Sequence, residues 1–280
     1  MRRCRNGDGA KPVGRIRLLK QIKMKKCAIF SVLLLVWACQ PAPDSARVIH
    51  IDHIVDLTHT LTPEFPFIPV RKLTYPFELI PMATLRENGV QANSWKIHEH
   101  LGTHIDAPNH FIESQKSVDQ LALEDLIVPV VVIDITRKAS ADPDAVLTVD
   151  DIQSFEQQHG KIPDRACVMM NSGWEKHLHD SLFVGLDRNN VKHYPGFSHE
   201  AIEWLLDHRT ISGIGVDVLS FDPGTDAQYI GHKSLFRKGK WGVECVASLN
   251  KIPPAGATII VGAPKVGNAT GGFSRIIAVW

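Results

Sequence analysis

Residues 100–110 read His-Leu-Gly-Thr-His-Ile-Asp-Ala-Pro-Asn-His, and this stretch decides how the rest of the chain is interpreted. Two imidazoles and a carboxylate, from His100, His104 and Asp106, form a ligand set that Zn²⁺ or Mn²⁺ accepts. His110 follows four residues later, close enough to act at the same site without being a ligand. A lone histidine would more often be an ordinary core or surface residue. Four ligand-type residues around one tight turn instead predict a centre for a divalent metal.

The sequence around this cluster favours a strand that ends in a tight loop. Gly102 weakens a helix interior and Pro108 breaks one, so an uninterrupted helix is excluded. Apolar residues in 95–101 are spaced as they are in a strand. We therefore expect the ligands at the end of such a strand. His98 would lie on the same strand face as His100, as a supporting or solvent-exposed residue.

The motif His-x-Gly-Thr-His-x-Asp-Ala-Pro-x-His-Phe, at residues 100–111, resembles the signature of the cyclase-type metal-dependent hydrolases. This family includes bacterial kynurenine formamidases and isatin hydrolases. Three further segments resemble the family in the same order, at residues 173–174, 194–197 and 215–223. The resemblance covers roughly residues 50–280. It implies an enzyme, a divalent metal and a homodimer.

Alternating strand and helix signals predict an α/β domain. Thr148 and Asp151 form a capping box whose helix Gly160 would end, and Ser198 would begin another helix. The family resemblance sharpens this prediction to a swivelling β/β/α fold. Strand-like apolar runs occupy residues 128–135, 166–170, 211–218, 257–261 and 275–280.

The resemblance also implies a second half of the metal site, far along the chain. His232 and Glu244 match a late histidine and glutamate of the family's formamidases. Asp106 would bridge two ions, with His100 and His104 on one and the late pair on the other. Glu244 could instead be a surface carboxylate, but its apolar neighbours indicate burial, and a buried glutamate needs a partner. Because the family also has single-metal members, the number of ions stays open.

The implied chemistry is hydrolysis of an amide C–N bond by metal-activated water. His110 would act first as general base and then as general acid to the leaving nitrogen, a role typically worth about 10²–10⁴-fold. The alternative for His110 is an ordinary structural histidine. The sequence has no Gly-x-Ser-x-Gly motif, so a serine-hydrolase route has no support. Trp174 and Phe273 would either line the substrate pocket or pack in the core.

Two classes of function fit these residues. The first is a hydrolase of an aryl formamide such as N-formylkynurenine or of a cyclic amide such as isatin, with other lactams and lactones as further substrates. The second is a non-catalytic, metal-binding surface lipoprotein. The complete His/His/Asp/His set favours an enzyme, because a decayed one would have lost a member. Glu99-His100 resembles the isatin-hydrolase branch, whereas Leu101 stands where many formamidases carry a small polar residue.

The N-terminal part of the sequence predicts export. Met24-Lys25-Lys26 precede an apolar run at residues 28–38, which is too short to cross ~30 Å of hydrocarbon as a helix of about 20 residues. Residues 36–39 resemble a bacterial lipobox with Cys39 as the lipidated residue. We expect a leader at 1–39, a tether at 40–49 and the catalytic domain at 50–280. The protein would be a periplasmic or cell-surface lipoprotein, with plain secretion as the alternative.

Charge and cysteine content agree with this division. Ten of the 31 Lys and Arg residues but only one of the 30 acidic residues lie in 1–39, which leaves 21 basic and 29 acidic residues, a net −8, in 40–280. An acidic domain has no field to attract nucleic acid, so the expected partner is a small-molecule substrate. Cys167 and Cys245 could pair in an oxidising compartment, but their apolar surroundings predict buried free thiols.

Overall fold

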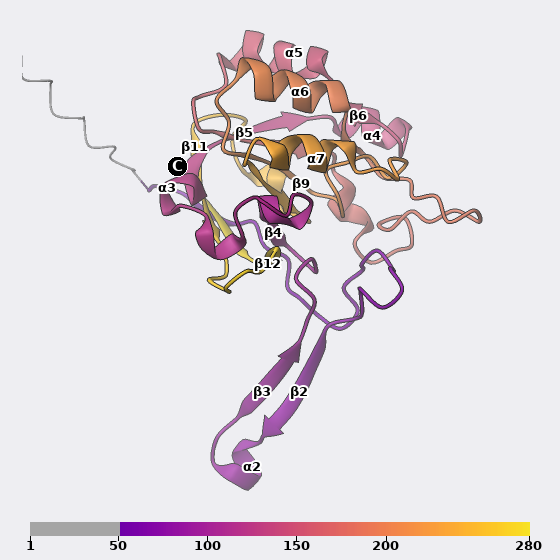
Figure 1. Cartoon of the computed structure of the whole chain (residues 1–280), viewed down its shortest axis with the longest axis vertical. Helices are drawn as coiled ribbons and strands as arrows, with labels where there is room; N and C mark the ends of the chain where they lie inside the picture. Colours follow the sequence, from indigo (N-terminus) through magenta and orange to yellow (C-terminus); the bar gives the residue numbers. More distant parts are fainter. Residues whose placement is uncertain (1–50) are drawn as a thin grey trace, which may run out of the picture. The chain divides into compact units, whose positions relative to one another are not determined.

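The computed structural model of the protein describes residues 51–280 (Figure 1). The elements in chain order are β1 (Ile54–Asp56), β2 (Glu78–Ala83), α2 (Leu85–Asn88), β3 (Ala92–Lys96), β4 (His104–Asp106), η1 (Pro108–His110), η2 (Val118–Gln120), α3 (Leu123–Leu126), β5 (Ile127–Asp134), α4 (Thr136–Ala141), β6 (Val146–Leu147), α5 (Val149–His159), β7 (Cys167–Asn171), η3 (Trp174–His177), β8 (Gly196–Phe197), α6 (His199–His208), β9 (Gly213–Val216), α7 (Ile230–Arg237), β10 (Trp241–Glu244), η4 (Leu249–Lys251), β11 (Ala257–Gly262), β12 (Gly271–Phe273) and β13 (Arg275–Val279), where η denotes a 3₁₀ helix.

A mixed sheet of nine strands forms the centre of this domain, in the order β1-β13-β11-β5-β7-β9-β10-β4-β12. Strands β5, β7, β9 and β10 pair in parallel, and their neighbours on both sides pair antiparallel. The five apolar runs expected to be strands correspond to β5, β7, β9, β11 and β13. The predicted α/β class is therefore confirmed.

Strand β5 shows that the sheet is buried on both faces. Val131 and Val132 belong to two different hydrophobic clusters, because successive residues of a strand point to opposite faces. The cluster on the Val131 side includes buried residues of α5, α6 and α7, which cover that face (Figure 1). The other cluster contains Ile105 of β4 together with Ile259 of β11. Strands far apart in the sheet order thus share one core, so the sheet is curled.

Both helices expected from local capping signals begin where the sequence predicts. Thr148 caps α5, its side chain accepts a hydrogen bond from the Asp151 amide, and the reciprocal Asp151 bond completes the capping box. Gly160 follows the last residue of α5. Ser198 caps α6 by accepting a hydrogen bond from the Ala201 amide. Local chemistry alone therefore sets these helix starts.

The backbone around the His/Asp cluster differs from the expectation of one strand running into a loop. Strand β3 ends at Lys96, and a separate strand, β4, begins at His104. Between them Gly102 adopts a φ of 72°, a left-handed conformation that glycine reaches without strain. His98 and His100 thus lie in a connecting segment and share no strand face. The cluster spans this connection and β4.

Strands β2 and β3 form a separate two-stranded hairpin with α2 at its tip, and this hairpin projects from the rest of the domain (Figure 1). Its apolar side chains are exposed, including Met82 and Trp95, at 67% and 63%. The strand-like spacing near Trp95 therefore belongs to this exposed hairpin. It does not belong to a strand that faces the core.

Several expectations fall on residues outside the described part of the chain. The leader at 1–39, the lipidated Cys39 and the tether at 40–49 all lie there. Among residues 51–280, none of the helices has the length and apolar character needed to cross a membrane. The two cysteines of this range, Cys167 and Cys245, are buried and free, which confirms that prediction.

Candidate active site

Strand β4 is the platform of the candidate site. Its three residues are buried, and Ile105 points into the core while His104 and Asp106 point to the opposite face. The strand lies between β10 and β12, which pair with it antiparallel. In that register Glu244 of β10 stands opposite His104. Strand pairing therefore brings the late glutamate to the early motif.

The side chain of His104 is oriented by its own loop. Its Nδ1 is 2.8 Å from the carbonyl oxygen of Gly102 and donates to it, which leaves Nε2 unprotonated in the neutral ring. Nε2 lies 3.3 Å from Asp106 Oδ1 and 3.4 Å from Glu244 Oε2. It is buried and makes no hydrogen bond with any residue in 51–280. A buried nitrogen aimed at two carboxylates in this way suits a metal ligand.

His232, near the start of α7, reaches the same point from another direction. Its Nδ1 is 2.5 Å from Asp222 Oδ2, so this carboxylate holds the ring. Its Nε2 then lies 3.4 Å from Asp106 Oδ2 and 3.3 Å from Glu244 Oε1. The ring also stacks on Phe221 at a centroid distance of 3.7 Å. A carboxylate behind an imidazole is the usual support of a metal-binding histidine.

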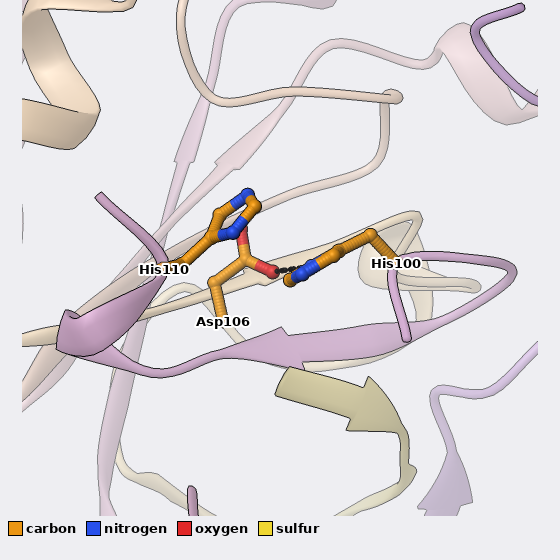
Figure 2. Close-up of side chains that lie close together, drawn as sticks. All are labelled: His100, Asp106 and His110. Carbon is orange, nitrogen blue, oxygen red and sulfur yellow. Dashed lines mark hydrogen bonds and ion pairs between the residues drawn. The ribbon is translucent and has the colours of Figure 1, made fainter. Parts of the chain in front are cut away.

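His100 and His110 complete the cluster on the side of the connecting segment. His100 Nδ1 lies 2.5 Å from Asp106 Oδ1, and the His110 ring stacks on that of His100 at 3.8 Å between centroids. Figure 2 shows both rings beside the Asp106 carboxylate. The structure thus brings together all six residues that the sequence singled out for metal binding or proton transfer: His100, His104, Asp106, His110, His232 and Glu244.

The charges of this buried cluster depend on one another. Burial opposes a charge on His104, but Asp106 and Glu244 outweigh it and raise the pKa of His104 to about 10. Burial likewise disfavours an ionised Asp106, yet His100 and His104 hold the pKa of its carboxyl well below the usual range. For His232 the neighbouring carboxylates again outweigh burial and raise its pKa well above the ordinary value. The buried carboxylates therefore require positive charge, which protons or a divalent cation can supply.

These residues fit a divalent metal. Ligand atoms within 4.8 Å of one another form two groups that share Asp106, one with His104 and Glu244 and the other with His100 and His110. The grouping differs from the expected one, which paired His100 with His104. Imidazole nitrogens and carboxylate oxygens together suit Zn²⁺ or Mn²⁺. The unsatisfied Nε2 of His104 and the converging carboxylates support the fit independently of the motif.

The pKa of His110 shifts in the opposite direction from those of His104 and His232. Burial lowers the pKa of His110 to about 3, with the neighbouring histidines opposing its charge further. The ring is therefore neutral near pH 7, with one of its two nitrogens unprotonated. Its position beside Asp106 is consistent with a proton carrier at the site.

A cavity of about 760 Å³ opens over the cluster. Its walls are mainly apolar, with the aromatic rings of Phe67, Tyr75, Phe111 and Tyr229 among the lining residues. His98 also lines it, with its ring 5.4 Å from that of Tyr75 and a pKa that burial lowers to about 4. His98 is therefore partly buried and not fully exposed, and its supporting role stays a prediction.

Neither Trp174 nor Phe273, for which pocket and core positions were both open, lies among the residues that line the cavity. Trp174 is buried in the main core, where its indole nitrogen donates to the Phe183 carbonyl, and it does not line the cavity. Phe273 of β12 packs next to Gly102 and is also absent from the residues that line the cavity. The aromatic residues that do line the cavity lie in irregular segments, where the sequence has no periodic pattern that could predict their position. Asp222 could have been found, because it belongs to the 215–223 segment that resembles the family.

Comparison with known proteins adds to this geometry. The Cyclase family model, described as "Putative cyclase", matches residues 55–223, more than half of the chain. The chain belongs to this family. Isatin hydrolase from Roseibium aggregatum is 33% identical to the chain over 241 residues, which cover 81% of this chain and 91% of that protein.

Two further Cyclase relatives agree. Kynurenine formamidase from Bacillus cereus is 29% identical over 145 residues, or 50% of this chain and 57% of that protein. A solved isatin hydrolase bound to the product analogue thioisatinate has a TM-score of 0.78 and 29% sequence identity, and covers 91% of this chain and 98% of that one. The family resemblance and the cyclase-type fold inferred from the sequence are therefore confirmed.

Proposed function

We propose that this protein is a metal-dependent amidohydrolase that opens a neutral cyclic aryl amide of the isatin type. The observation that carries the proposal is the convergence of imidazoles and carboxylates at the floor of an aromatic-walled cavity. Membership of the Cyclase family and the relatives named isatin hydrolase and kynurenine formamidase support amide hydrolysis. A buried, ligand-rich site with all its members present favours an enzyme over a non-catalytic metal-binding lipoprotein.

We assign a divalent ion, Zn²⁺ or Mn²⁺, to His104, Asp106 and Glu244, with His100 and His232 completing the ligand set around Asp106. When bound, such an ion lowers the pKa of water and polarises a carbonyl. The chain's own residues do the rest. Asp222 holds His232 in place, and the aromatic wall orients a flat substrate above the cluster. Metal analysis per chain separates a one-ion from a two-ion site.

We assign the proton transfers to His110. Water attack on the amide carbon releases one proton, and breaking the C–N bond requires one at the leaving nitrogen. His110 stacks on His100 beside Asp106, where its unprotonated ring nitrogen would accept the first proton and return it to the leaving nitrogen. The acid formed ionises and releases the second proton of the water to solvent, so the products are an arylamine and a carboxylate that a keto carbon joins to the same ring.

The charge of the cavity ranks the two substrate candidates. Among the described residues that line it, none is a lysine or an arginine, whereas Glu99, Asp106 and Glu244 are acidic. Arg71 and Lys72 lie in the loop at its edge, but both are exposed and outside the lining. N-formylkynurenine carries an α-ammonium and an α-carboxylate, and the lining offers that carboxylate no cationic side chain. Isatin is neutral, so the cavity favours the cyclic amide.

The deciding experiment assays the purified protein with added Mn²⁺ or Zn²⁺ against isatin and an aryl formamide in parallel. We expect metal-dependent turnover of isatin with the larger kcat/KM. His104→Ala should lose both metal and activity. Hydrolysis that is unchanged after chelation and verified metal removal would reject the metal-dependent proposal.

We also propose export and lipid anchoring at Cys39, supported by the basic residues, apolar run and lipobox-like segment before it. A location outside the cytoplasm fits poorly with an intracellular tryptophan pathway. It fits better with an imported or environmental substrate. Cys39→Ser should release the protein from membrane fractions. Wild-type protein found in the cytoplasm with its leader uncleaved would contradict the proposed export.

A homodimer is the proposed assembly. The projecting β2–β3 hairpin exposes apolar side chains, Leu79, Met82 and Trp95 among them, and exposed apolar surface of this kind is typical of a protein interface. Light scattering should give twice the chain mass, and Trp95→Glu should shift the protein toward monomer. A monomeric wild type at micromolar concentration would contradict the assembly.

A further inference from the structure

A threonine and a glutamate stand behind His100, on the side away from Asp106. Thr270 donates its backbone N–H to Glu99 Oε2 at 2.8 Å, and its hydroxyl donates to the same oxygen. The Thr270 hydroxyl oxygen also lies 2.9 Å from His100 Nε2. A continuous row of polar contacts therefore runs from the half-exposed Glu99 through Thr270 and His100 to the buried Asp106.

The direction of these hydrogen bonds follows from counting protons. The Thr270 hydroxyl has one proton, and Glu99 Oε2 already accepts the Thr270 amide proton. If the hydroxyl proton pointed to His100, two oxygen lone pairs would face each other across the Thr270–Glu99 contact. The hydroxyl therefore donates to Glu99 and accepts from His100, so Nε2 of His100 carries the proton. In the metal-free protein Nδ1 lies 2.5 Å from a carboxylate oxygen of Asp106, so Nδ1 carries a proton as well. A bound metal would replace that proton, because Nε2 keeps its own and Nδ1 is then the nitrogen with a free lone pair.

The His100 ring is confined on its other sides as well. His110 stacks on one face of the ring. The backbone of Gly271, next to Thr270, passes so close that a Cβ there would lie 2.8 Å from His100 Cε1 and 2.4 Å from the Ile105 carbonyl oxygen. Residues 270–271 thus hold the ring by a hydrogen bond and by contact.

We propose that Thr270 and Glu99 are positioning residues, which fix His100 as its Nε2–H tautomer and aim Nδ1 at the metal. The effect that we expect Thr270 and Glu99 to have on metal affinity rests on the proposed function. The tautomer of His100 does not depend on that function. Neither residue belongs to the ligand cluster. A hydrogen bond to the distal nitrogen sets which nitrogen of a histidine binds metal, and loss of such a support typically weakens affinity about 10–100-fold.

The chain offers a matched control for this arrangement. Thr136 donates both its backbone N–H and its hydroxyl to Asp134 Oδ1, as Thr270 does to Glu99, but no hydrogen bond joins its hydroxyl to any histidine of residues 51–280. Thr136→Val therefore removes the same kind of hydroxyl–carboxylate bond away from the site. Thr270→Ser retains the hydroxyl, whereas Thr270→Val removes it at nearly constant volume.

The test combines two measurements on purified full-length protein. The first is ¹⁵N NMR of histidine-labelled protein, with His100 assigned from a His100→Gln spectrum. We expect a protonated Nε2 on His100 in both the metal-free and the Zn²⁺-loaded wild type. The second is Zn²⁺ affinity by chelator competition, with an expected loss of about 10–100-fold in Thr270→Val. Thr270→Ser and Thr136→Val should bind like the wild type, and Glu99→Gln should fall between, because its amide oxygen still accepts.

The outcomes separate this inference from the proposed function. An unprotonated Nε2 on His100 in the wild type would overturn the inference, whether or not metal binds. So would Thr270→Val protein that keeps wild-type Zn²⁺ affinity. A wild type that binds no Zn²⁺ or Mn²⁺ would instead overturn the proposed metal site, while the NMR result would still decide the tautomer.

Discussion

Glu244 Oε2 lies 3.4 Å from His104 Nε2, because the antiparallel register of β10 and β4 places these two residues opposite each other. The same glutamate accepts a hydrogen bond from the Phe221 amide through Oε1. It therefore joins the early motif to the segment that carries Asp222. Its position is therefore set by the sheet.

Glu244→Gln should weaken metal binding and reduce kcat, because the variant keeps the shape of the side chain but removes one of the buried negative charges. We expect at least a tenfold loss of metal affinity, in the range typical for groups around a metal. Glu203→Gln on α6 is the matched control, since Glu203 forms an ion pair with His199 at the surface. Equal metal content and kcat for Glu244→Gln and wild type would contradict the role assigned to this carboxylate.

Asp222→Asn tests the support of His232. Asp222 accepts hydrogen bonds from the Gly231 and His232 amides and from His232 Nδ1. Within residues 51–280, Asp226 accepts backbone bonds alone, from Gln228 and Ile230. Both substitutions should lower the thermal midpoint by weakening the start of α7. Asp222→Asn should also lower kcat about 10–100-fold. If Asp226→Asn lowers kcat equally, helix stability and not imidazole orientation is responsible.

His110→Ala should keep most of the metal and lose about 10²–10⁴-fold in kcat, because it removes the proton carrier and leaves the buried carboxylates in place. His208→Ala removes an exposed histidine that stacks on Trp204, and it should change neither quantity. Steady-state kinetics across pH with metal analysis provide the measurement. A near wild-type kcat at every pH would show that His110 carries no proton.

Gly271→Ala should damage the site through the backbone. A Cβ at this position would meet the Ile105 carbonyl oxygen and the His100 ring, so β12 must move away from β4. Gly267→Ala is the control, since a Cβ there meets nothing within 4 Å. We expect lower thermal stability and lower metal affinity for Gly271→Ala alone. Wild-type values for that variant would show that the close approach of β12 is not required.

Asp217 predicts a pH dependence of stability away from the ligand cluster. Burial raises the pKa of its carboxyl to about 6, although Ser172 and the Trp174 amide donate hydrogen bonds to it. Because this folded-state pKa lies above the value of about 3.9 for an unfolded aspartate, the contribution is fully present below pH 4 and is lost as pH rises through 6. The difference amounts to about 3 kcal/mol as an order of magnitude. Denaturant unfolding between pH 4 and 7 measures it.

Asp217→Asn should remove this part of the pH dependence. The slope of stability with pH is the relevant quantity, because an asparagine amide facing the same donors lowers stability at every pH. A variant with the same slope as the wild type would show that Asp217 stays ionised throughout this range.

Local signals in the sequence were sufficient to predict part of the metal site and the starts of two helices. The spacing of His100, His104 and Asp106 predicted one set of convergent ligands, and the capping residues Thr148 and Ser198 predicted two helix starts. Each of these features depends on atoms within a few residues of one another, so no knowledge of the fold is required. The motif order was then specific enough to indicate the family.

The tertiary structure decided the rest, because the decisive contacts join residues that are distant in the sequence. The alternating spacing near Trp95 is the same for an exposed hairpin as for a buried strand, and only the packing shows which one forms. The sequence left Trp174 either at the pocket or in the core, and the structure places it in the core. Glu244 reaches His104 through strand register, and Thr270 reaches His100 through the pairing of β12 with β4. A pattern of residues specifies which face of a strand is apolar, whereas the partner strand and its register follow from packing of the whole curled sheet.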